Sequence, residues 1–572
     1  MMDAKRISPS PAGGDKGNGE AFAPPGSDPA GWILPFLPGV LIAVAFFVLY
    51  ARGAAPTVLN SDAAEMQVLA WQPGIAHSIG YPFYVWIAGV SRFLPFGDIA
   101  HRVNILSAIF CAASLFLLYR LAFRLCSGSL PLRTAGAATA AFSYGFSYTL
   151  WDVSLYANMY SLQVFVSLGV VCLSMLWTET GRRAYLYTAA FLYGTMAGIH
   201  LTIVGLLPAL ALLILIQPSS RRPGLPGMTC AGGLAALGAA FGHVFLFWLL
   251  WQRHSPFDHW HKVILTNLDL FPVDAAKADR FWFAWWFCIR SAQHLATGLH
   301  QAWTAWGGHR LQLFPMGVVC QFFPVFTLIA CIGFVTSWRK WRISLFLTAL
   351  LLFPACLASY LRMKLHLYSL VPYGIVSLFL GMGIVWLGER LKRILEGLKR
   401  SGISFSRGVQ WIAVAVLVAL LFGANQASRN GWIKRMEGRP ERGARPLISL
   451  LGPRPDRRHE YRHRVLGRSI ADNLAPHAVV FVPWRYVYLI EYVCRVERNR
   501  ADVSVYEANP YPFSPSGFSE ANRGIIGDTI GRRPIYLAQC PDGIVPYRSI
   551  LRAPGLWELV PEMKRGKGEC LK

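Results

Sequence analysis

The sequence predicts a membrane all-α protein with about 11 transmembrane helices, followed by a small extracytoplasmic α/β domain. Of the 572 residues, 54% are hydrophobic and only 15% are charged, whereas a soluble domain carries about 25% charged residues. The mean hydropathy is +0.38, and apolar runs long enough to cross a bilayer recur throughout residues 32–425. These properties exclude a soluble Rossmann enzyme and a fibrous protein.

The N-terminal 50 residues predict a tail and a first span. Residues 1–30 mix Gly, Pro, Ser and alternating charges without periodicity, which predicts a disordered cytoplasmic tail. The apolar run at 32–50 is too long for a cleavable signal. A span-length window places the other spans of a membrane domain at 31–426 near 104–123, 134–150, 159–177, 185–199, 201–216, 229–250, 313–337, 343–361, 367–387 and 409–426.

The basic residues predict the orientation. The apolar run at 185–216 is too long for one crossing without strong tilt, so we expect two short helices there. With a cytoplasmic N-terminus, the basic clusters between spans then lie on the cytoplasmic side. The net charge of +25 therefore indicates membrane orientation and not a nucleic acid partner. The loop 51–103, the segment 251–312 and the region 427–572 become extracytoplasmic, in what we expect to be a bacterial inner membrane.

The 427–572 region alternates in type after an Arg/Pro-rich connector. Strand-like stretches at 477–483, 502–507 and 534–539 alternate with helical stretches at 486–497 and 520–530, which predicts a small α/β domain. It has no nucleophile with a base and no Gly-rich phosphate loop, which favours a cap or assembly module over catalysis. Three of the 11 cysteines lie here, and an oxidising compartment permits one disulfide among Cys494, Cys540 and Cys570.

Two acidic residues follow the first span. If Ser61 caps a helix that starts there, Asp62 and Glu65 are three residues apart and share a face. Two carboxylates on one face can converge on a substrate hydroxyl. The alternative is that Asp62 only stabilises the helix N-terminus, which contributes under ~1 kcal/mol. The position at the membrane surface favours general-base chemistry with a lipid-linked substrate.

These residues resemble the GT-C superfamily of integral-membrane glycosyltransferases. Within it, the resemblance is strongest to the branch of the protein O-mannosyltransferase that modifies immunoglobulin-like plexin and transcription-factor (IPT) domains, with its bacterial relatives. It covers most of residues 50–220 and the remainder loosely. The residues that carry it are Asp62, Glu65, His77, Gly80, Tyr81, Pro82, Arg102, Val103, Asn104, Ser107, Ala108, Trp151, Gly198, His200, Pro208 and Asp502.

The resemblance implies an inverting glycosyltransferase that uses a polyprenyl-phosphate sugar, with mannose as one option, at an extracytoplasmic cavity. Asp62 would be the general base for a hydroxyl of a protein, glycan or lipid acceptor, and Glu65 would be the second catalytic carboxylate. Cations on the outer side would stabilise the leaving phosphate. The candidates for binding the donor phosphate or the substrate are His77, Tyr81, Arg102, Asp152, His200, Arg362, Lys364 and His366.

Several of these residues have alternative interpretations. The cluster at 362–366 is an exception to the positive-inside pattern, and it fits donor binding or simple headgroup binding. His200 lies between apolar residues and fits a buried core histidine as well. Asn158 stands where the family resemblance leads us to expect an acidic residue, for which Asp152 is a substitute. One carboxylate pair supplies too few ligands for a metal, so we expect neither a metal nor a cofactor.

Two other classes of function stay open. A transporter of lipid-linked sugar would show inverted repeats, and the sequence has no second copy of the block at 62–82. A non-catalytic membrane scaffold is compatible with Asn158. The sequence does not name the sugar, the acceptor or the oligomeric state.

Overall fold

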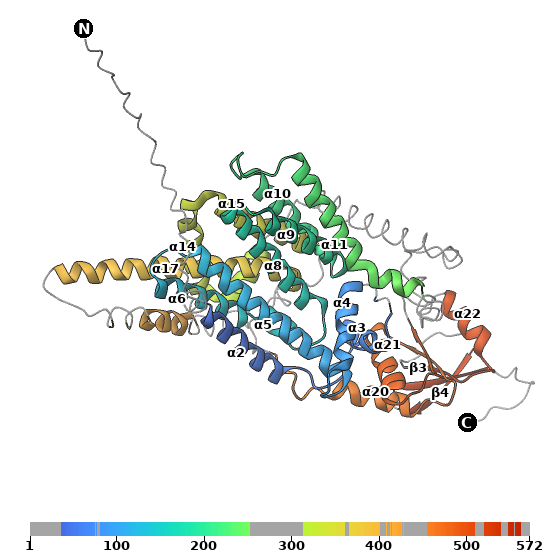
Figure 1. Ribbon diagram of the computed structural model, residues 1–572. Coiled ribbons are helices and arrows are strands. Elements are labelled where there is room, and N and C mark those ends of the chain that lie inside the picture. The colour runs from blue at the N-terminus through green and yellow to red at the C-terminus, as the bar shows by residue number, and fades with distance from the viewer. Residues whose placement is uncertain are drawn as a thin grey trace, which may run out of the picture.

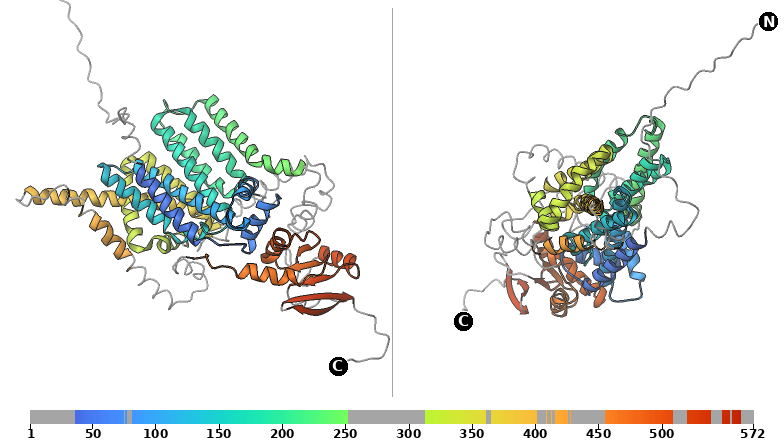
Figure 2. Two further views of the ribbon diagram at one scale, coloured as in Figure 1. Left: turned by 60° about the horizontal axis from the view of Figure 1, so that its bottom comes forward. Right: turned by 90° about the vertical axis from the view of Figure 1, so that its left-hand side faces the viewer.

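A computed structural model gives the architecture shown in Figures 1 and 2. The structure describes residues 36–74, 76, 81–251, 313–360, 365–400, 408, 412, 415–425, 427, 455–508, 520–538, 547–553 and 555–561. The predicted tail at 1–30 and nearly all of the predicted segment at 251–312 lie outside these residues.

The first half of the described chain is helical. Its elements are α2 (Leu37–Gly53), α3 (Ser61–Trp71), α4 (Pro82–Val90), η1 (Ser91–Phe93), α5 (Ile99–Leu125), α6 (Leu130–Gly145), α7 (Tyr148–Val153), α8 (Met159–Thr180), α9 (Arg183–Thr195), η2 (Met196–Gly198), η3 (Leu201–Leu206), α10 (Leu207–Leu215) and α11 (Leu225–Trp251). The later membrane helices are α14 (Leu313–Ser337), η6 (Trp338–Lys340), α15 (Trp341–Tyr360), α16 (Leu365–Tyr368) and α17 (Leu370–Arg400).

The described chain has five helical segments long and apolar enough to cross a membrane. They are Ile99–Leu125, Met159–Thr180, Leu225–Val244, Phe314–Ala358 and Leu370–Gly397. Helices also occupy the other predicted spans, and the 185–216 run forms separate short helices, as predicted. The predicted class, a helical membrane protein with a small α/β region, is confirmed, while the number of spans and the domain boundaries stay predictions.

The C-terminal region is built on one mixed sheet. Its strands are β1 (Val479–Val482), β2 (Ser504–Glu507), β3 (Ile535–Leu537), β4 (Tyr547–Ala553) and β5 (Leu556–Pro561), in the order β2-β1-β3-β5-β4. Strand β1 pairs in parallel with β2 and β3, and β5 pairs antiparallel with β3 and β4. The helices are α20 (Arg462–Asp472), α21 (Trp484–Glu491), which continues as the π-helical turn η8 (Tyr492–Glu497), and α22 (Glu520–Thr529).

Two parts of this region were not predicted from the sequence. Helix α20 lies inside what reads as an Arg/Pro-rich connector, because its many arginines hide the few apolar positions that it buries. The β4–β5 hairpin was missed because β4 does not alternate between polar and apolar residues. The three predicted strands and two predicted helices are present.

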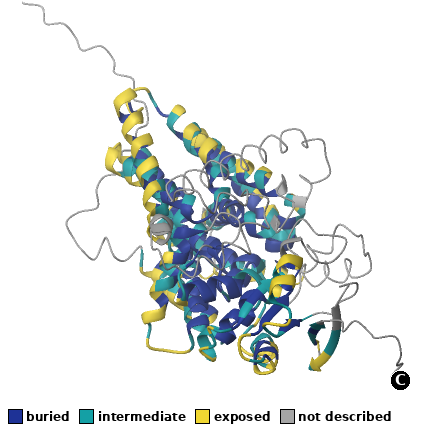
Figure 3. Cartoon of the chain, turned by 90° about the vertical axis from the view of Figure 1, so that its right-hand side faces the viewer, coloured by how far each residue is buried: buried dark blue, intermediate teal, exposed yellow. Residues whose placement is uncertain are grey.

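The two regions share part of their hydrophobic core. Four residues of the membrane region, Val58, Ala64, Val68 and Ala100, belong to the same buried cluster as side chains of α20, α21 and β1. Figure 2 shows the α/β region at one end of the helices, and Figure 3 shows the buried residues continuing between them. Helix α3 therefore lies between the bundle and the α/β region.

Candidate active site

Helix α3 places Asp62 in its first turn. The residue before the helix, Asn60, has an extended backbone and makes no side-chain cap hydrogen bond. Ser61 has a positive φ of 56°, and its hydroxyl donates to Asp62 Oδ1 at 3.2 Å. The predicted capping by Ser61 is therefore wrong, because Ser61 is already the first helical residue and its hydroxyl points to the carboxylate.

Asp62 lines a pocket of about 240 Å³. The other lining residues come from α3, from the loop before α8, from α8 itself and from α16; they are Met66, Tyr156, Ala157, Asn158, Met159, Tyr160, His366 and Leu367. Two predicted site residues, Asp62 and His366, thus lie in one pocket although some 300 residues separate them in the chain. A carboxylate, an imidazole and two phenol groups therefore line the same pocket.

Glu65 lies on a neighbouring part of the α3 surface that faces away from the pocket. Its side chain is completely buried, it is not among the pocket-lining residues, and it is a hydrogen-bond partner of Tyr488 on α21. Burial, together with the neighbouring carboxylate of Glu65, raises the pKa of Tyr488 well above its usual range. The structure therefore does not bring Asp62 and Glu65 together at one substrate position.

Two buried amides hold α3 in place. Gln67 Oε1 accepts from the backbone N–H of Leu59 at 3.0 Å, and Gln67 Nε2 donates to Asn104 Oδ1 at 2.8 Å. Asn104 Oδ1 also accepts from the N–H of Ala157 at 2.9 Å, and Asn104 Nδ2 donates to the carbonyl of Ala55 at 2.9 Å. These amides join α3 and α5 to the pocket wall. Sequence reasoning missed Gln67, although a buried amide in a mostly apolar helix was an available signal.

Asn158 is the N-cap of α8. Its Oδ1 accepts from the N–H of Ser161 at 3.0 Å, while its Nδ2 donates to the carbonyls of Val153 at 2.7 Å and Tyr156 at 2.6 Å. A carboxylate could make the cap but neither of the other two bonds, because it has no N–H to donate. The asparagine thus fits its surroundings better than the acid expected at this position.

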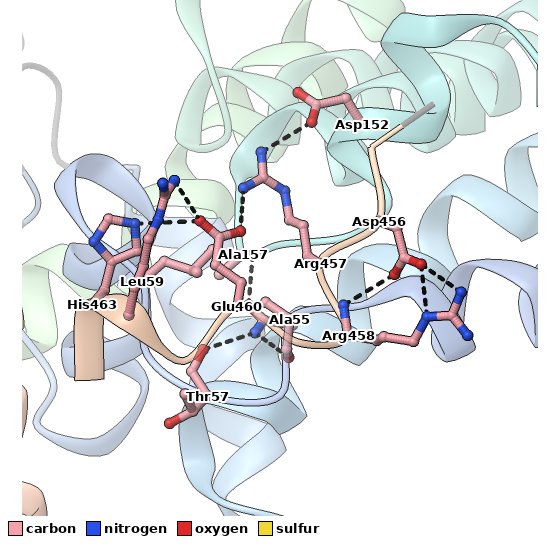
Figure 4. A network of polar contacts seen from close by, with 12 residues as sticks. Ala55, Thr57, Leu59, Asp152, Ala157, Asp456, Arg457, Arg458, Glu460 and His463 are labelled. Carbon is pink, nitrogen blue, oxygen red and sulfur yellow. Dashed lines mark hydrogen bonds and ion pairs between the residues drawn. The ribbon is translucent and has the colours of Figure 1, made fainter. Parts of the chain in front are cut away.

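Asp152 is paired with a residue of the region after the bundle. Its Oδ1 lies 3.1 Å from Nη2 of Arg457, whose Nη1 lies 2.8 Å from Glu460 (Figure 4). The N–H of Arg457 donates to the carbonyl of Gly53 at 2.9 Å, and the indole of Trp151 donates to the carbonyl of Pro455 at 2.9 Å. Asp152 is therefore an anchor for the chain at 455–460, and it does not line the Asp62 pocket.

Arg457 also contacts the pocket wall. Its guanidinium carbon lies 4.8 Å from the ring centre of Tyr156. Burial would lower the pKa of Arg457, but Asp152 and Glu460 outweigh burial and raise it. Hydrogen bonds from His463, together with Arg457 and Arg462, lower the pKa of Glu460 to about 2. Arg457 and Glu460 are thus both charged at neutral pH, and the guanidinium contacts Tyr156, which lines the pocket.

His200 lies in an aromatic group beside the pocket. Its ring stacks on Tyr81 with a centroid separation of 5.8 Å and packs against Tyr160 at 5.3 Å and Tyr368 at 5.5 Å. The N–H of Thr202 donates to His200 Nδ1 at 3.3 Å, which favours the tautomer with its proton on Nε2. His200 contacts Tyr160, which lines the pocket, while His200 and Tyr81 are not themselves among the lining residues.

The guanidinium of Arg102 binds backbone carbonyls near the start of α5. Its guanidinium donates to the carbonyls of Phe96, Arg92 and Gly97 at 2.6–3.0 Å, so it fixes the turn before α5. Arg102 is not among the residues that line the Asp62 pocket, and its predicted role at the donor phosphate stays a prediction. The predictions for His77, Arg362 and Lys364 lie outside the described residues.

Within the described part of the chain, no group of three or more His, Cys, Asp or Glu side chains could hold a metal ion. The expected absence of a metal stays a prediction. Cys494 is buried, while Cys540 and Cys570 lie outside the described residues, so the disulfide alternatives stay open.

Comparison with known proteins finds a matching family. Residues 62–223 match a protein-family model described as Protein O-mannosyl-transferase TMEM260 N-terminal domain. The Protein O-mannosyl-transferase TMEM260 of Mus musculus is 37% identical over 150 residues, which are 25% of this chain and 21% of the mouse protein. The chain thus matches about a fifth of that relative's length.

Solved structures are similar at lower identity. The archaeal oligosaccharyltransferase AglB from Archaeoglobus fulgidus, in complex with an inhibitory peptide and a dolichol-phosphate, is 14% identical with a TM-score of 0.44; 88% of this chain and 69% of AglB are covered. ArnT from Cupriavidus metallidurans in the apo state is 13% identical with a TM-score of 0.46; 93% of this chain and 98% of ArnT are covered. The predicted resemblance is thus confirmed through residues 62–223, where the chain is similar to the N-terminal domain of the protein O-mannosyltransferase TMEM260, a match that begins at Asp62.

Proposed function

We propose that the protein is a membrane glycosyltransferase that moves a sugar from a polyprenyl-phosphate carrier to an acceptor hydroxyl. The observation that carries the proposal is the position of Asp62, in the first turn of α3 and in a pocket shared with His366 and two phenols. The name of the mouse relative makes mannose the first sugar to test and a protein hydroxyl the first acceptor.

In the proposed reaction Asp62 is the general base. The acceptor hydroxyl gives its proton to the Asp62 carboxylate as its oxygen forms a bond to the anomeric carbon. The bond from that carbon to the phosphate oxygen breaks, and the electron pair leaves with the lipid phosphate. Attack from the face opposite the phosphate inverts the configuration of the sugar.

The leaving phosphate needs compensation of its charge. His366 is the described candidate, because it lines the same pocket as Asp62. Arg362 and Lys364 precede it in the sequence and are proposed as further donor-binding cations. A guanidinium can bind two phosphate oxygens together and has no matching role at a sugar hydroxyl. Arg102 is not included, because its guanidinium is bonded to three backbone carbonyls.

We further propose that α3 holds its position through Glu65 and Tyr488. The carboxylate is buried between the bundle and α21, and its neighbours include Ala64 and Val68, which are part of the core shared with the α/β region. The 427–572 region then supports the wall that carries the base. The pocket and this region would both be extracytoplasmic, with the N-terminus on the cytoplasmic side.

The test is sugar transfer by purified full-length protein in lipid. Polyprenyl-phosphate mannose and a polyprenyl-phosphate hexose of another kind are offered with and without a Ser/Thr-containing acceptor protein. Release of polyprenyl phosphate that depends on the acceptor supports the proposal. If the protein instead moves the intact donor between leaflets, a transporter is the better interpretation; binding of donor without turnover would favour a scaffold.

A further inference from the structure

A second hollow lies at the end of the bundle opposite the Asp62 pocket. It has a volume of about 340 Å³, and its walls come from the end of α5, the end of α14, the start of α15 and the distal part of α17. Helix α17 begins at Leu370, near the Asp62 pocket, and lines this hollow from Met382 to Arg393. At 1.5 Å per residue, these lining residues lie about 18 to 35 Å along the helix from its start.

The hollow carries uncompensated positive charge. Arg339, Lys340 and Arg393 line it, against the single carboxylate of Glu389 among the lining residues. None of the three cations has an ion pair with a described residue. Elsewhere at this end of the bundle, Arg124 pairs with Glu179 and Lys392 with Glu396. The three lining cations and the one lining carboxylate leave the hollow with a net positive charge.

A helix N-terminus and a hydroxyl add to this environment. Ser127 and Gly128 line the hollow directly before α6, whose first residue is Leu130. Backbone N–H groups at the start of a 16-residue helix favour an anion. The N-cap residue Ser129 has a buried hydroxyl without a hydrogen-bond partner in the described structure. Both features favour a phosphate oxygen more than another cation.

Tryptophan side chains occur at this end of the bundle. Trp386 lines the hollow, and Trp338 in η6 and Trp341 at the start of α15 are 42% and 51% exposed. Tryptophan is enriched where a protein meets the interface between lipid headgroups and hydrocarbon. A neighbouring hollow of similar size shares Lys340 and Ile343 with the hollow described above and is also lined by Arg342. The site is therefore at the depth of lipid headgroups.

We propose that this hollow binds the phosphodiester headgroup of an anionic glycerophospholipid. Arg339 and Arg393 provide forked donors, Lys340 provides a point charge between the two hollows, and the tryptophans locate the glycerol region. Free phosphate would be attracted by the same cations, but a soluble ion makes no use of the exposed indoles at this end of the bundle. The site is independent of the transfer chemistry at Asp62.

The experiment measures lipid retained by full-length protein with native mass spectrometry. Wild type in neutral detergent is titrated with phosphatidylglycerol or phosphatidylcholine, with and without inorganic phosphate. The Lys340→Gln/Arg393→Gln variant is compared with Arg182→Gln/Arg183→Gln, which removes the same charge from residues that do not line the hollow. A third variant, Lys340→Arg/Arg393→Lys, keeps both charges.

We expect wild type to retain phosphatidylglycerol and not phosphatidylcholine. Removing Lys340 and Arg393 should weaken retention roughly thirtyfold, since each cation contributes about a factor of five. The control and the charge-preserving variant should keep it. Equal weakening by both charge-removing variants, no preference for phosphatidylglycerol, or full displacement by inorganic phosphate overturns the proposal. If the double variant melts early without lipid, Arg393→Gln against Arg182→Gln gives the same comparison.

Discussion

The two sides of α3 differ in what they contact. Asp62 and Met66 line the pocket, whereas Glu65 and Val68 are buried on the side of α21. Residues three and four apart lie on neighbouring parts of a helix surface, and here the boundary between two environments falls between Asp62 and Glu65. The spacing that suggests two cooperating carboxylates thus produces one carboxylate at a pocket and one in an interface.

This difference indicates that residues after the bundle, including the α/β region, hold the walls of the Asp62 pocket in position. The side of α3 behind Asp62 is packed by α21, and the loop that forms the opposite wall is held by Arg457 from the chain that enters the α/β region. Both contacts are made by residues that follow the membrane helices in the chain. Variants on the two sides should therefore separate loss of chemistry from loss of support.

Asp62→Asn should have the largest effect. It keeps the size of the side chain but removes the basicity, and general-base catalysis contributes about 10²–10⁴-fold. We expect at least a roughly hundredfold loss of transfer, with donor binding and thermal melting close to wild type, because a first-turn carboxylate contributes under ~1 kcal/mol to stability. Near-normal transfer by the folded variant would remove Asp62 from the mechanism.

Asn158→Asp tests whether the pocket wall needs an amide. The substitution removes the donors to Val153 and Tyr156 and directs a carboxylate oxygen at their carbonyls. We expect a loss of about 2–4 kcal/mol of unfolding free energy, measured by denaturation in detergent. Asn158→Ala, which loses the bonds without adding charge, is the matched control. A more stable Asp variant than Ala variant would contradict this interpretation.

Much of the fold was predictable because hydropathy is local in the chain. The long apolar runs gave the helices, and an apolar strand such as β1 was recognisable from its own residues. The contacts that divide α3 were not predictable, since Arg457 and Asp152 are 305 positions apart. Asp62 was identified from its resemblance and position, while the partner of Glu65 depended on α21, more than 400 residues later.

The α/β region should lose stability as pH rises from about 4.5 to about 7, because of Glu491. Burial raises the pKa of Glu491 from 4.5 to about 7 although Arg495 opposes the shift. In that window the folded state keeps a proton that the unfolded state has lost, so stability falls with rising pH. Glu491→Gln should remove this pH-dependent loss of stability, which is about 3 kcal/mol across the window, and the dependence of Tm on pH should become flatter.

Glu460, which pairs with Arg457, should give the opposite pH dependence, with stability lost as the pH falls. The pKa of Glu460 is lowered to about 2, so its contribution is present above the unfolded value near 4.5 and is lost as pH falls toward 2. Glu460→Gln should therefore reduce stability at neutral pH and leave the 4.5–7 window unchanged. A Glu491→Gln variant that keeps the wild-type slope in that window contradicts the assignment.

Arg457→Ala should have a moderate effect on both stability and transfer. It leaves Asp152 and Glu460 without their shared cation and removes the contact with Tyr156. Because the guanidinium is partly exposed, we expect about 1–2 kcal/mol of destabilisation, with a few-fold loss of transfer. Arg458→Ala is the control, since Arg458 pairs with Asp456 at the surface. Equal effects of the two variants would show that the Asp152 anchor does not support the pocket.

The smallest effect should come from Glu65→Gln, because the amide keeps an oxygen that can accept from Tyr488. Transfer should fall between wild type and Asp62→Asn, and by less than the few-fold loss expected for Arg457→Ala, since only the position of α3 changes and the base remains. Tyr488→Phe should give a similar decrease, and the double variant should be no worse than either single one if both act through the same contact. Rates are compared at saturating acceptor, with melting followed in parallel. If Glu65→Gln were as slow as Asp62→Asn while Tyr488→Phe stayed active, Glu65 would take part in the chemistry itself, and the division of α3 into a pocket side and a support side would be wrong.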